Sequence, residues 1–266
     1  MKLFAVTRPV PDSLAHCELT HIERTPIDAG RARAQHSAYE RALTSLGCEV
    51  VSITAAHDQP DSVFIEDTAI VLEDLAVIAR PGAGSRRAET AAVASTLVAF
   101  RQLQFLSEPA TLDGGDVLRL GRTLYVGVGG RTNAAGVQQL RDIVSRWDYE
   151  VQSIAVDSCL HLKSAITEVA PGIVVLNPQW VDRGTFRNHE IIEVDPSEPS
   201  AANVLRVGHG GHGGHGGHGG NVVLCAAAYP RTNARLSAVA TVQTIDVSEL
   251  AKAEGALTCC SLIFYR

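Results

Sequence analysis

Residues 69–79 read Ala69-Ile-Val-Leu-Glu-Asp-Leu-Ala-Val-Ile-Ala79, two short apolar runs on either side of Glu73-Asp74. Such runs around a polar pair predict two strands joined by a turn. Pro81-Gly-Ala-Gly84 then predicts a second turn, and Ser85 is a good residue to cap a helix over 86–102. We therefore expect a unit of two strands followed by a helix.

The same unit recurs along the chain. Residues 9–29 contain three prolines and are predicted to form a long loop. Together the patterns favour an α/β or α+β fold. The remaining strands are predicted at Met1–Thr7, Val50–Thr54, Val117–Leu120, Thr123–Val128, Ala165–Val169, Gly172–Leu176, Val222–Ala226 and Val242–Asp246, and the remaining helices at Arg31–Leu46 (ended by Gly47), Asn133–Trp147, 232–241 and 248–253.

Residues 208–220 contain only glycine and histidine, in the order G-HGG-HGG-HGG-HGG. Such a composition cannot bury a core, so we expect a flexible loop between two strands of one hairpin, Asn203–Val207 and Asn221–Cys225. The simpler interpretation is a low-complexity expansion without a role. The alternative is metal binding, adventitious or purposeful, by His209, His212, His215 and His218.

Composition narrows the class of protein. The chain has 266 residues, of which 45% are hydrophobic and 20% charged, enough to bury a core. Its net charge of −6 argues against a nucleic-acid partner. No apolar run is long enough for a membrane span, and the first residues do not resemble a signal peptide. Since the six cysteines are scattered, we expect free thiols in the cytoplasm.

Two segments carry groups suited to covalent catalysis. Cys259 stands in Leu257-Thr-Cys-Cys-Ser261 and His161 in Leu160-His-Leu-Lys-Ser164. Taken alone, each would more often be a packed core residue, but together they can form an activated nucleophile. Two acidic clusters, Asp61-Ser-Val-Phe-Ile-Glu-Asp67 and Leu112-Asp-Gly-Gly-Asp116, are flanked by apolar sequence, and buried carboxylates need a cationic partner. We therefore expect a cysteine hydrolase with a cationic substrate.

The order of these motifs resembles the dimethylarginine dimethylaminohydrolase family of the guanidine-modifying enzyme superfamily, over nearly the whole chain. The resemblance implies a five-bladed α/β-propeller, with blades of strands plus one helix around a central polar channel, and a single catalytic domain over residues 1–266. The motifs are Asp61–Asp67, Arg80–Arg87, Leu112–Leu118, Arg131–Asn133, Leu160–Ser164 and Leu257–Cys259, supported by Ala34–Tyr39 and Tyr229–Thr232.

The resemblance also implies roles for individual residues. Cys259 matches the nucleophile, His161 the general acid and base, and Asp113 the carboxylate beside that histidine. Among the implied substrate-binding residues, two arginines match those that hold the α-carboxylate, and Leu19 matches a residue of a flexible lid. Glu254 departs from the family pattern, which has Asp, and the Gly/His segment is not part of that pattern. The implied substrate-binding residues are Leu19, Asp61, Glu66, Asp67, Arg86, Arg131, Ala253 and Glu254.

The implied activity is hydrolysis of asymmetric dimethylarginine and monomethylarginine to citrulline plus the methylamine, through a covalent S-alkylthiouronium on cysteine. It needs no metal or organic cofactor, and its partner is a small guanidine, with no nucleic acid and no membrane. The oligomeric state is left open, a homodimer included. Two alternatives stay open: an arginine deiminase-like hydrolase acting on arginine or another guanidine, and a metal-binding protein that works through the loop histidines.

Overall fold

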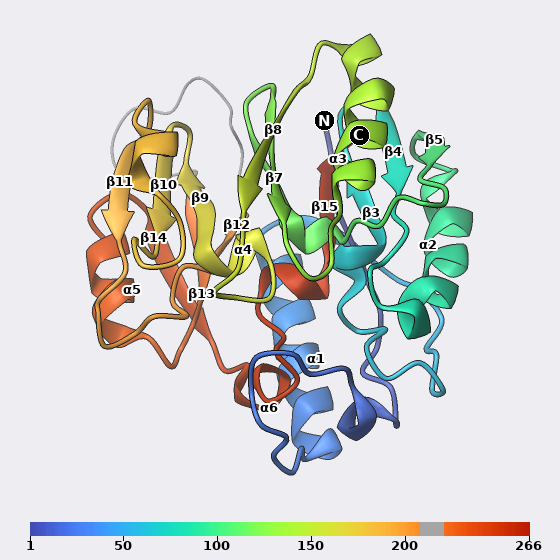
Figure 1. The fold of residues 1–266 in the computed structure, drawn as a ribbon. Coiled ribbons are helices and arrows are strands. Elements are labelled where there is room, and N and C mark those ends of the chain that lie inside the picture. The colour runs from blue at the N-terminus through green and yellow to red at the C-terminus, as the bar shows by residue number, and fades with distance from the viewer. Residues whose placement is uncertain (208–220) are drawn as a thin grey trace.

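The computed structural model describes residues 1–207 and 221–266, whose strands form five three-stranded sheets, or blades (Figure 1). The predicted five-bladed α/β-propeller is thereby confirmed. The blades are β15 (Leu262–Tyr265), β1 (Leu3–Thr7) and β2 (Cys48–Ser52); β3 (Ala69–Val71), β4 (Leu75–Ile78) and β5 (Gln102–Phe105); β6 (Val117–Leu120), β7 (Thr123–Val128) and β8 (Glu150–Ala155); β9 (Ile166–Ala170), β10 (Ile173–Leu176) and β11 (Glu190–Glu193); and β12 (Leu205–Val207), β13 (Val222–Ala226) and β14 (Thr241–Ile245).

Every blade has the same topology. Its first two strands pair antiparallel, and its middle and last strands pair parallel. A parallel pair needs a crossover connection, which is usually a helix. Four blades use helices, and the fourth blade in chain order has only the 3₁₀ turn η6 (Arg183–Phe186), so the expected helix is missing there. The crossover helices are α1 (Ala29–Ser45), α2 (Thr90–Leu97), α3 (Ala134–Val144) and α5 (Pro230–Leu236).

Local signals explain where the two longest helices begin and end. The Asp28 side chain accepts a hydrogen bond from the Arg31 backbone at the start of α1, and Gly47 follows its end with φ +89°, a conformation that favours glycine. Asn133 caps α3 by accepting from the Gly136 backbone. These two helices therefore lie close to where the sequence predicts them.

The predicted helix over 86–102 is wrong in its bounds. Residues Gly84–Glu89 form the 3₁₀ helix η3, and α2 begins only at Thr90. Ser85 does not cap a helix, because its hydroxyl donates to Glu18. The tighter turn places the Arg86 side chain in the buried centre of the molecule.

The blades close into a ring through the two ends of the chain. Strand β15 pairs antiparallel with β1, and Lys2 and Arg266 exchange backbone hydrogen bonds of 2.8 and 2.9 Å. The two termini accordingly lie close together in Figure 1. Packing reinforces this seam, because the Phe264 ring lies 6.0 Å from that of Phe4 and 5.3 Å from that of Phe100, between centroids.

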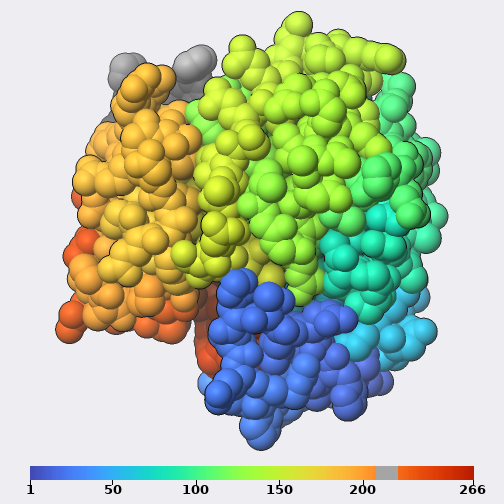
Figure 2. Space-filling view, viewed as in Figure 1, coloured from blue at the N-terminus to red at the C-terminus, as the bar shows by residue number. Residues whose placement is uncertain are grey.

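The fifth blade confirms the predicted hairpin, since β12 and β13 pair antiparallel with Val207 opposite Val222. The segment between them, with its four histidines, lies outside the described residues. The predicted N-terminal loop contains the short 3₁₀ turn η1 (Leu14–His16) and otherwise no helix or strand between residues 8 and 28. Figure 2 shows the N-terminal residues, in blue, as a lobe at the lower edge of the molecule.

Across residues 1–207 and 221–266, none of the helices has the length and apolar character that crossing a bilayer requires.

Candidate active site

The loops that precede the inner strands meet at the centre of the propeller. Strands β3, β6, β9, β12 and β15 form the inner edges of the blades, where β3 contacts β15, and β9 contacts both β6 and β12. Four of them follow a short helical turn, and these turns pack together. The turns are η2 (Ile65–Thr68), η4 (Gly114–Asp116), α4 (Leu162–Ala165) and η7 (Thr258–Cys260).

These turns and their neighbours surround a small central cavity. Eight of the eleven predicted site residues line it, together with Glu18, Phe64 and Leu160. Its free volume is about 20 Å³, room for little more than one water molecule. A guanidine substrate can enter only if the surrounding side chains or loops move apart. The eight residues are Asp61, Asp67, Arg86, Arg131, His161, Ala253, Glu254 and Cys259.

The other three predicted residues lie outside the lining of this cavity. Asp113 is fully buried behind His161, with Oδ2 3.1 Å from His161 Nε2. The Glu66 side chain points away and accepts hydrogen bonds from Lys163 and Thr258. Leu19 packs, partly buried, against a hydrophobic core cluster.

His161 is surrounded by buried carboxylates. Its Nδ1 lies 3.7 Å from Asp67, and its Nε2 is hydrogen-bonded to Asp113. Burial lowers the pKa of His161, but the charges of Asp67, Asp113 and Asp116 outweigh it and raise the pKa to about 9. The imidazole is therefore charged at neutral pH.

Asp67 takes part in the same charge balance. Burial opposes its ionisation, but the charges of His161 and Arg86 lower its pKa to about 2. The backbone of Gly115 donates to its Oδ1 at 3.0 Å. A Cβ at Gly115 would lie 2.6 Å from His161 Nδ1 and 2.7 Å from Asp67 Oδ1, so only glycine fits between them.

Asp116 is a buried carboxylate to which the sequence analysis gave no role. It accepts hydrogen bonds from the backbone of Leu162 at 3.0 Å and from the Thr132 hydroxyl at 2.7 Å. Burial raises its pKa to about 6. It ties the backbone next to His161 to the η4 turn. The spacing Asp-Gly-Gly-Asp was the signal that could have revealed it, because Asp113 and Asp116 both lie beside the same histidine.

The Cys259 thiol is held in its neutral form. Burial, together with the charges of Glu66 and Asp67, raises its pKa to about 12, while Lys163 acts in the opposite direction. Its side chain lines the same cavity as His161. A cation placed in this cavity would favour the thiolate, since an adjacent positive charge lowers a thiol's pKa.

The two predicted carboxylate-binding arginines differ in their surroundings. Arg86 is buried and donates to Asp67, to Glu89 and to the Asp61 and Phe64 carbonyls, so most of its donors are already used. Arg131 is half-buried and donates to the Thr20 hydroxyl at 3.0 Å.

Glu254 acts on the N-terminal loop. Its carboxylate accepts hydrogen bonds from three consecutive backbone N–H groups, those of Thr20, His21 and Ile22. Asp61 similarly accepts from the Glu18 backbone at 3.1 and 3.2 Å. Two carboxylates at the cavity thus fix the loop that contains Leu19.

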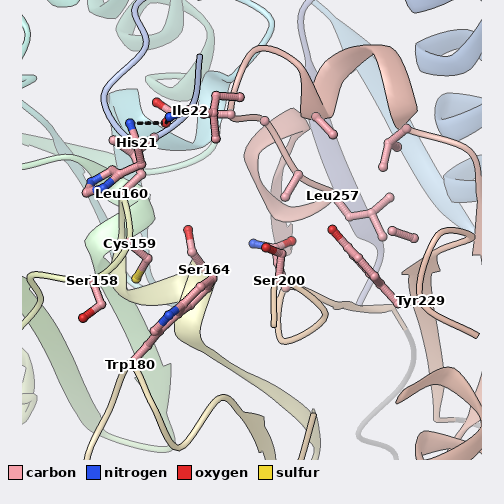
Figure 3. Close-up of a pocket in the computed structure, with 17 residues that line it drawn as sticks. His21, Ile22, Ser158, Cys159, Leu160, Ser164, Trp180, Ser200, Tyr229 and Leu257 are labelled. Atoms are coloured by element: carbon pink, nitrogen blue, oxygen red, sulfur yellow. Dashed lines mark hydrogen bonds between the residues drawn. The ribbon is translucent and has the colours of Figure 1, made fainter. Parts of the chain in front are cut away.

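A second cavity, of about 300 Å³, adjoins the first and shares Leu160 and Glu254 with it. In Figure 3, His21 and Leu160 lie at one end of it, and Trp180 and Tyr229 lie farther away. It lies under the loop that Glu254 holds.

Within the described parts of the chain, one group of side chains could offer ligands to a metal. Possible ligand atoms of Asp67, Asp113 and His161 lie within 4.8 Å of one another. A metal would have to displace the proton of His161, since a histidine ligates as neutral imidazole. The ion pairs of the protonated imidazole already account for this clustering.

A five-bladed α/β-propeller with a cysteine, a histidine and buried carboxylates at its centre defines the class of cysteine-dependent enzymes that modify guanidines. A family model described as "N,N dimethylarginine dimethylhydrolase, eukaryotic" matches residues 20–264. The chain belongs to this dimethylarginine dimethylaminohydrolase family.

Individual relatives agree. A protein of Streptomyces coelicolor named N(G),N(G)-dimethylarginine dimethylaminohydrolase is 48% identical over 171 residues, 64% of this chain and 66% of its own length. The protein of that name from Pseudomonas aeruginosa is 30% identical over 240 residues, 89% of this chain and 90% of its own. A solved structure of the Pseudomonas aeruginosa enzyme, a cysteine-to-serine mutant complexed with citrulline, has a TM-score of 0.91 at 29% identity and covers 99% of this chain and 100% of its own.

Proposed function

We propose that this protein hydrolyses N-ω-methylated arginines, namely asymmetric dimethylarginine and monomethylarginine, to citrulline plus dimethylamine or methylamine. One observation carries the proposal: a buried thiol, a charged imidazole and two buried carboxylates, Asp61 and Asp67, line the same cavity. The curated names of the relatives, and citrulline in the solved structure, support the same reaction.

In the first step, the buried carboxylates orient the guanidinium and offset its charge. The substrate's own cation favours loss of the Cys259 proton to solvent, which burial otherwise opposes. The thiolate attacks the guanidinium carbon and forms a tetrahedral adduct. His161, charged at neutral pH, donates its proton to the departing amine, and an S-alkylthiouronium remains on Cys259.

In the second step, His161 is neutral and can accept a proton from water. The resulting hydroxide attacks the carbon of the thiouronium, and the C–S bond breaks. The hydroxyl proton left on this carbon is transferred to the departing thiolate as the urea carbonyl forms, so that citrulline leaves and Cys259 is again a neutral thiol. Asp113 fixes the imidazole through Nε2, while Nδ1 faces Asp67. The same ring thus serves as acid and then as base.

At the other end of the substrate, we propose that Arg131 makes the main contact with the α-carboxylate. Arg86 is committed to Asp67 and Glu89, so it could bind substrate only by releasing one of them. Its more immediate effect is to keep Asp67 ionised for the guanidinium.

The test is citrulline release from purified protein, treated with a chelator because the chain carries a histidine-rich segment. Asymmetric dimethylarginine, monomethylarginine and arginine are supplied in parallel. We expect turnover of the methylated substrates, little from arginine, and none from a Cys259→Ser variant. Faster turnover of arginine than of the methylated substrates would identify the protein as an arginine deiminase-like hydrolase. A Cys259→Ser variant with a near-normal rate would refute the mechanism.

We also propose a cytoplasmic location. All six cysteines are buried free thiols, as expected in a reducing compartment. Cell fractionation with an antibody to the protein checks this, and recovery from an oxidising compartment would contradict it.

A further inference from the structure

Four side chains form a closed ring of hydrogen bonds behind the nucleophile. Thr258 donates from its hydroxyl to Glu66 Oε2 at 2.7 Å, and Lys163 donates to Glu66 Oε1. The Asn203 amide nitrogen donates to Thr258 Oγ1 at 3.0 Å and to the Lys163 carbonyl at 3.1 Å. The Asn203 amide oxygen accepts from the Thr258 backbone at 3.1 Å. We call these four residues the Thr258 ring.

Three members of the ring are buried, and Lys163 is partly exposed. Asn203, Thr258 and Glu66 are 6%, 5% and 7% exposed. Both amide hydrogens and the oxygen of Asn203 are used, and the Thr258 hydroxyl both donates and accepts. Removing one member would leave buried polar groups without partners, which is costly. The ring therefore has one favoured geometry.

Three of the four ring members lie on a side away from the Cys259 cavity, and Asn203 lines the adjoining cavity of about 300 Å³. Glu66, Lys163 and Thr258 line a separate cavity of about 260 Å³, whose lining shares no residue with that of the Cys259 cavity. Residues adjacent in sequence face different cavities. Asp67 and Cys259 line the small central cavity, whereas Glu66 and Thr258 line the separate one. A group on the far side can act on the reaction only through the backbone or through its charge.

Each ring member lies in the segment leading into the inner strand of a different blade. Glu66 precedes β3, Lys163 precedes β9, Asn203 precedes β12 and Thr258 precedes β15. The ring therefore fixes four blades relative to one another at the point where the nucleophile sits. Because Thr258 is held at both its backbone N–H and its hydroxyl, the next residue, Cys259, is held as well.

Charge adds a second effect. Glu66 acts to raise the pKa of the Cys259 thiol, and Lys163 acts to lower it. By binding Glu66 directly, Lys163 offsets a negative charge that would otherwise oppose the thiolate.

We propose that Asn203, Thr258, Glu66 and Lys163 are positioning residues that hold Cys259 for attack on the guanidinium, and that Glu66 is not a substrate ligand. This inference rests on the proposed function and deepens it. Asn203, Thr258 and Lys163 are additions to the predicted site, and Glu66 changes its role.

The main test replaces Thr258 by Val, which keeps the shape and removes the hydroxyl. We expect kcat for asymmetric dimethylarginine to fall about 10- to 100-fold while KM stays within about threefold, since small misplacements of a reacting group cost rate rather than binding. Thr258→Ser should restore kcat. Thr241→Val, at an exposed position of β14, is the matched control and should change neither constant. A rise in KM with kcat unchanged, or a normal kcat, overturns the proposal.

A second test does not depend on turnover or on the fold of the Thr258 variant. Alkylation of Cys259 by iodoacetamide is followed without substrate, by mass spectrometry of its peptide, across alkaline pH. Lys163→Met, at a partly exposed site, should slow this alkylation several-fold at each pH, and Lys163→Arg should restore it. An unchanged rate overturns the charge effect. If the wild-type protein releases no citrulline, the proposed function fails, whereas this readout still decides whether Lys163 acts on the Cys259 thiol.

Discussion

At the residue scale, His161 is held in its charged form by three buried carboxylates, Asp67, Asp113 and Asp116. This protonation state suits both halves of the proposed reaction. The imidazolium can donate a proton in the first step, and the neutral imidazole that remains can accept one in the second. Gly115 is part of this arrangement, since any side chain there would separate His161 from Asp67. The chemistry of the site therefore depends on a glycine as much as on its ionisable groups.

The raised pKa of His161 predicts how stability depends on pH. The pKa is about 9 in the folded protein and about 6.5 in an unfolded chain. Its contribution is therefore present in full below about pH 6.5 and is lost as the pH rises through about 9. We expect the free energy of urea unfolding to fall by at most about 3 kcal/mol over this interval. His161→Gln should remove most of that slope, and parallel slopes for both proteins would contradict the assignment.

Sequence identified most side chains of the site but not their orientation. Glu66 and Asp67 are adjacent acids in one apolar setting, and nothing in the pattern tells which of them faces the cysteine. The 3₁₀ turn η2 decides this, since it turns the two side chains toward different cavities. Asn203 belongs to none of the motifs in the sequence. Its relation to the other site residues is structural, since it precedes the inner strand β12 as they precede other inner strands.

At the element scale, the N-terminal loop is held over the cavity by hydrogen bonds to side chains rather than by strand pairing. Glu254 accepts from three of its backbone N–H groups and Asp61 from a fourth. Since the enclosed volume is about 20 Å³, side chains or loops around the cavity must move apart for substrate to enter, and this loop contributes Glu18 to the lining. Displacing the loop would break its three hydrogen bonds to Glu254.

Replacing Glu254 by Ala should loosen the loop. Hydrogen bonds to a charged acceptor contribute roughly 1.5–3 kcal/mol, so amide hydrogen exchange at residues 20–22 should accelerate about tenfold or more. Exchange is measured without substrate by mass spectrometry, which separates loop motion from any direct effect on substrate binding. Glu23→Ala, an exposed residue of the same loop, is the control. Unchanged exchange in the Glu254 variant would show that other contacts hold the loop.

Among the elements, sequence predicted every antiparallel pair except β15–β1, but only β2 and β14 among the third strands. The pairs β3–β4 and β6–β7 are apolar and buried, and they flank clear turns. The outer strands β5, β8 and β11 are polar and partly exposed, so no apolar alternation marks them. Strand β2 begins two residues earlier than predicted, at Cys48, and β15, the apolar run Leu262–Tyr265, was missed.

At the scale of the whole molecule, the five blades enclose one centre, and each supplies a loop to it. The ring is closed by β15 against β1, where Phe264 packs with Phe4 and Phe100. The same strand follows directly after the turn that carries Cys259. The seam of the fold and the proposed nucleophile therefore share one short segment.

Replacing Phe264 by Ala should weaken this seam. The side chain is 5% exposed, and truncating a buried phenylalanine costs about 3–5 kcal/mol. Phe105→Ala, at a position 59% exposed on β5, should change the free energy of unfolding by no more than about 0.5 kcal/mol. Urea unfolding compares the two. Equally small changes in the free energy of unfolding for both variants would show that closure of the propeller does not depend on packing between β15 and β1.

The closing strand also has a consequence for how the protein is made. A ribosome produces β1 first and β15 last, and 255 residues separate Thr7 from Leu262. Translation proceeds at roughly 5–20 residues per second, so strand β1 is exposed without β15 for on the order of 10–50 s. During that interval the nascent chain presents an open strand edge, the kind of surface that chaperones protect from aggregation. The first blade to be translated is thus the last to be completed.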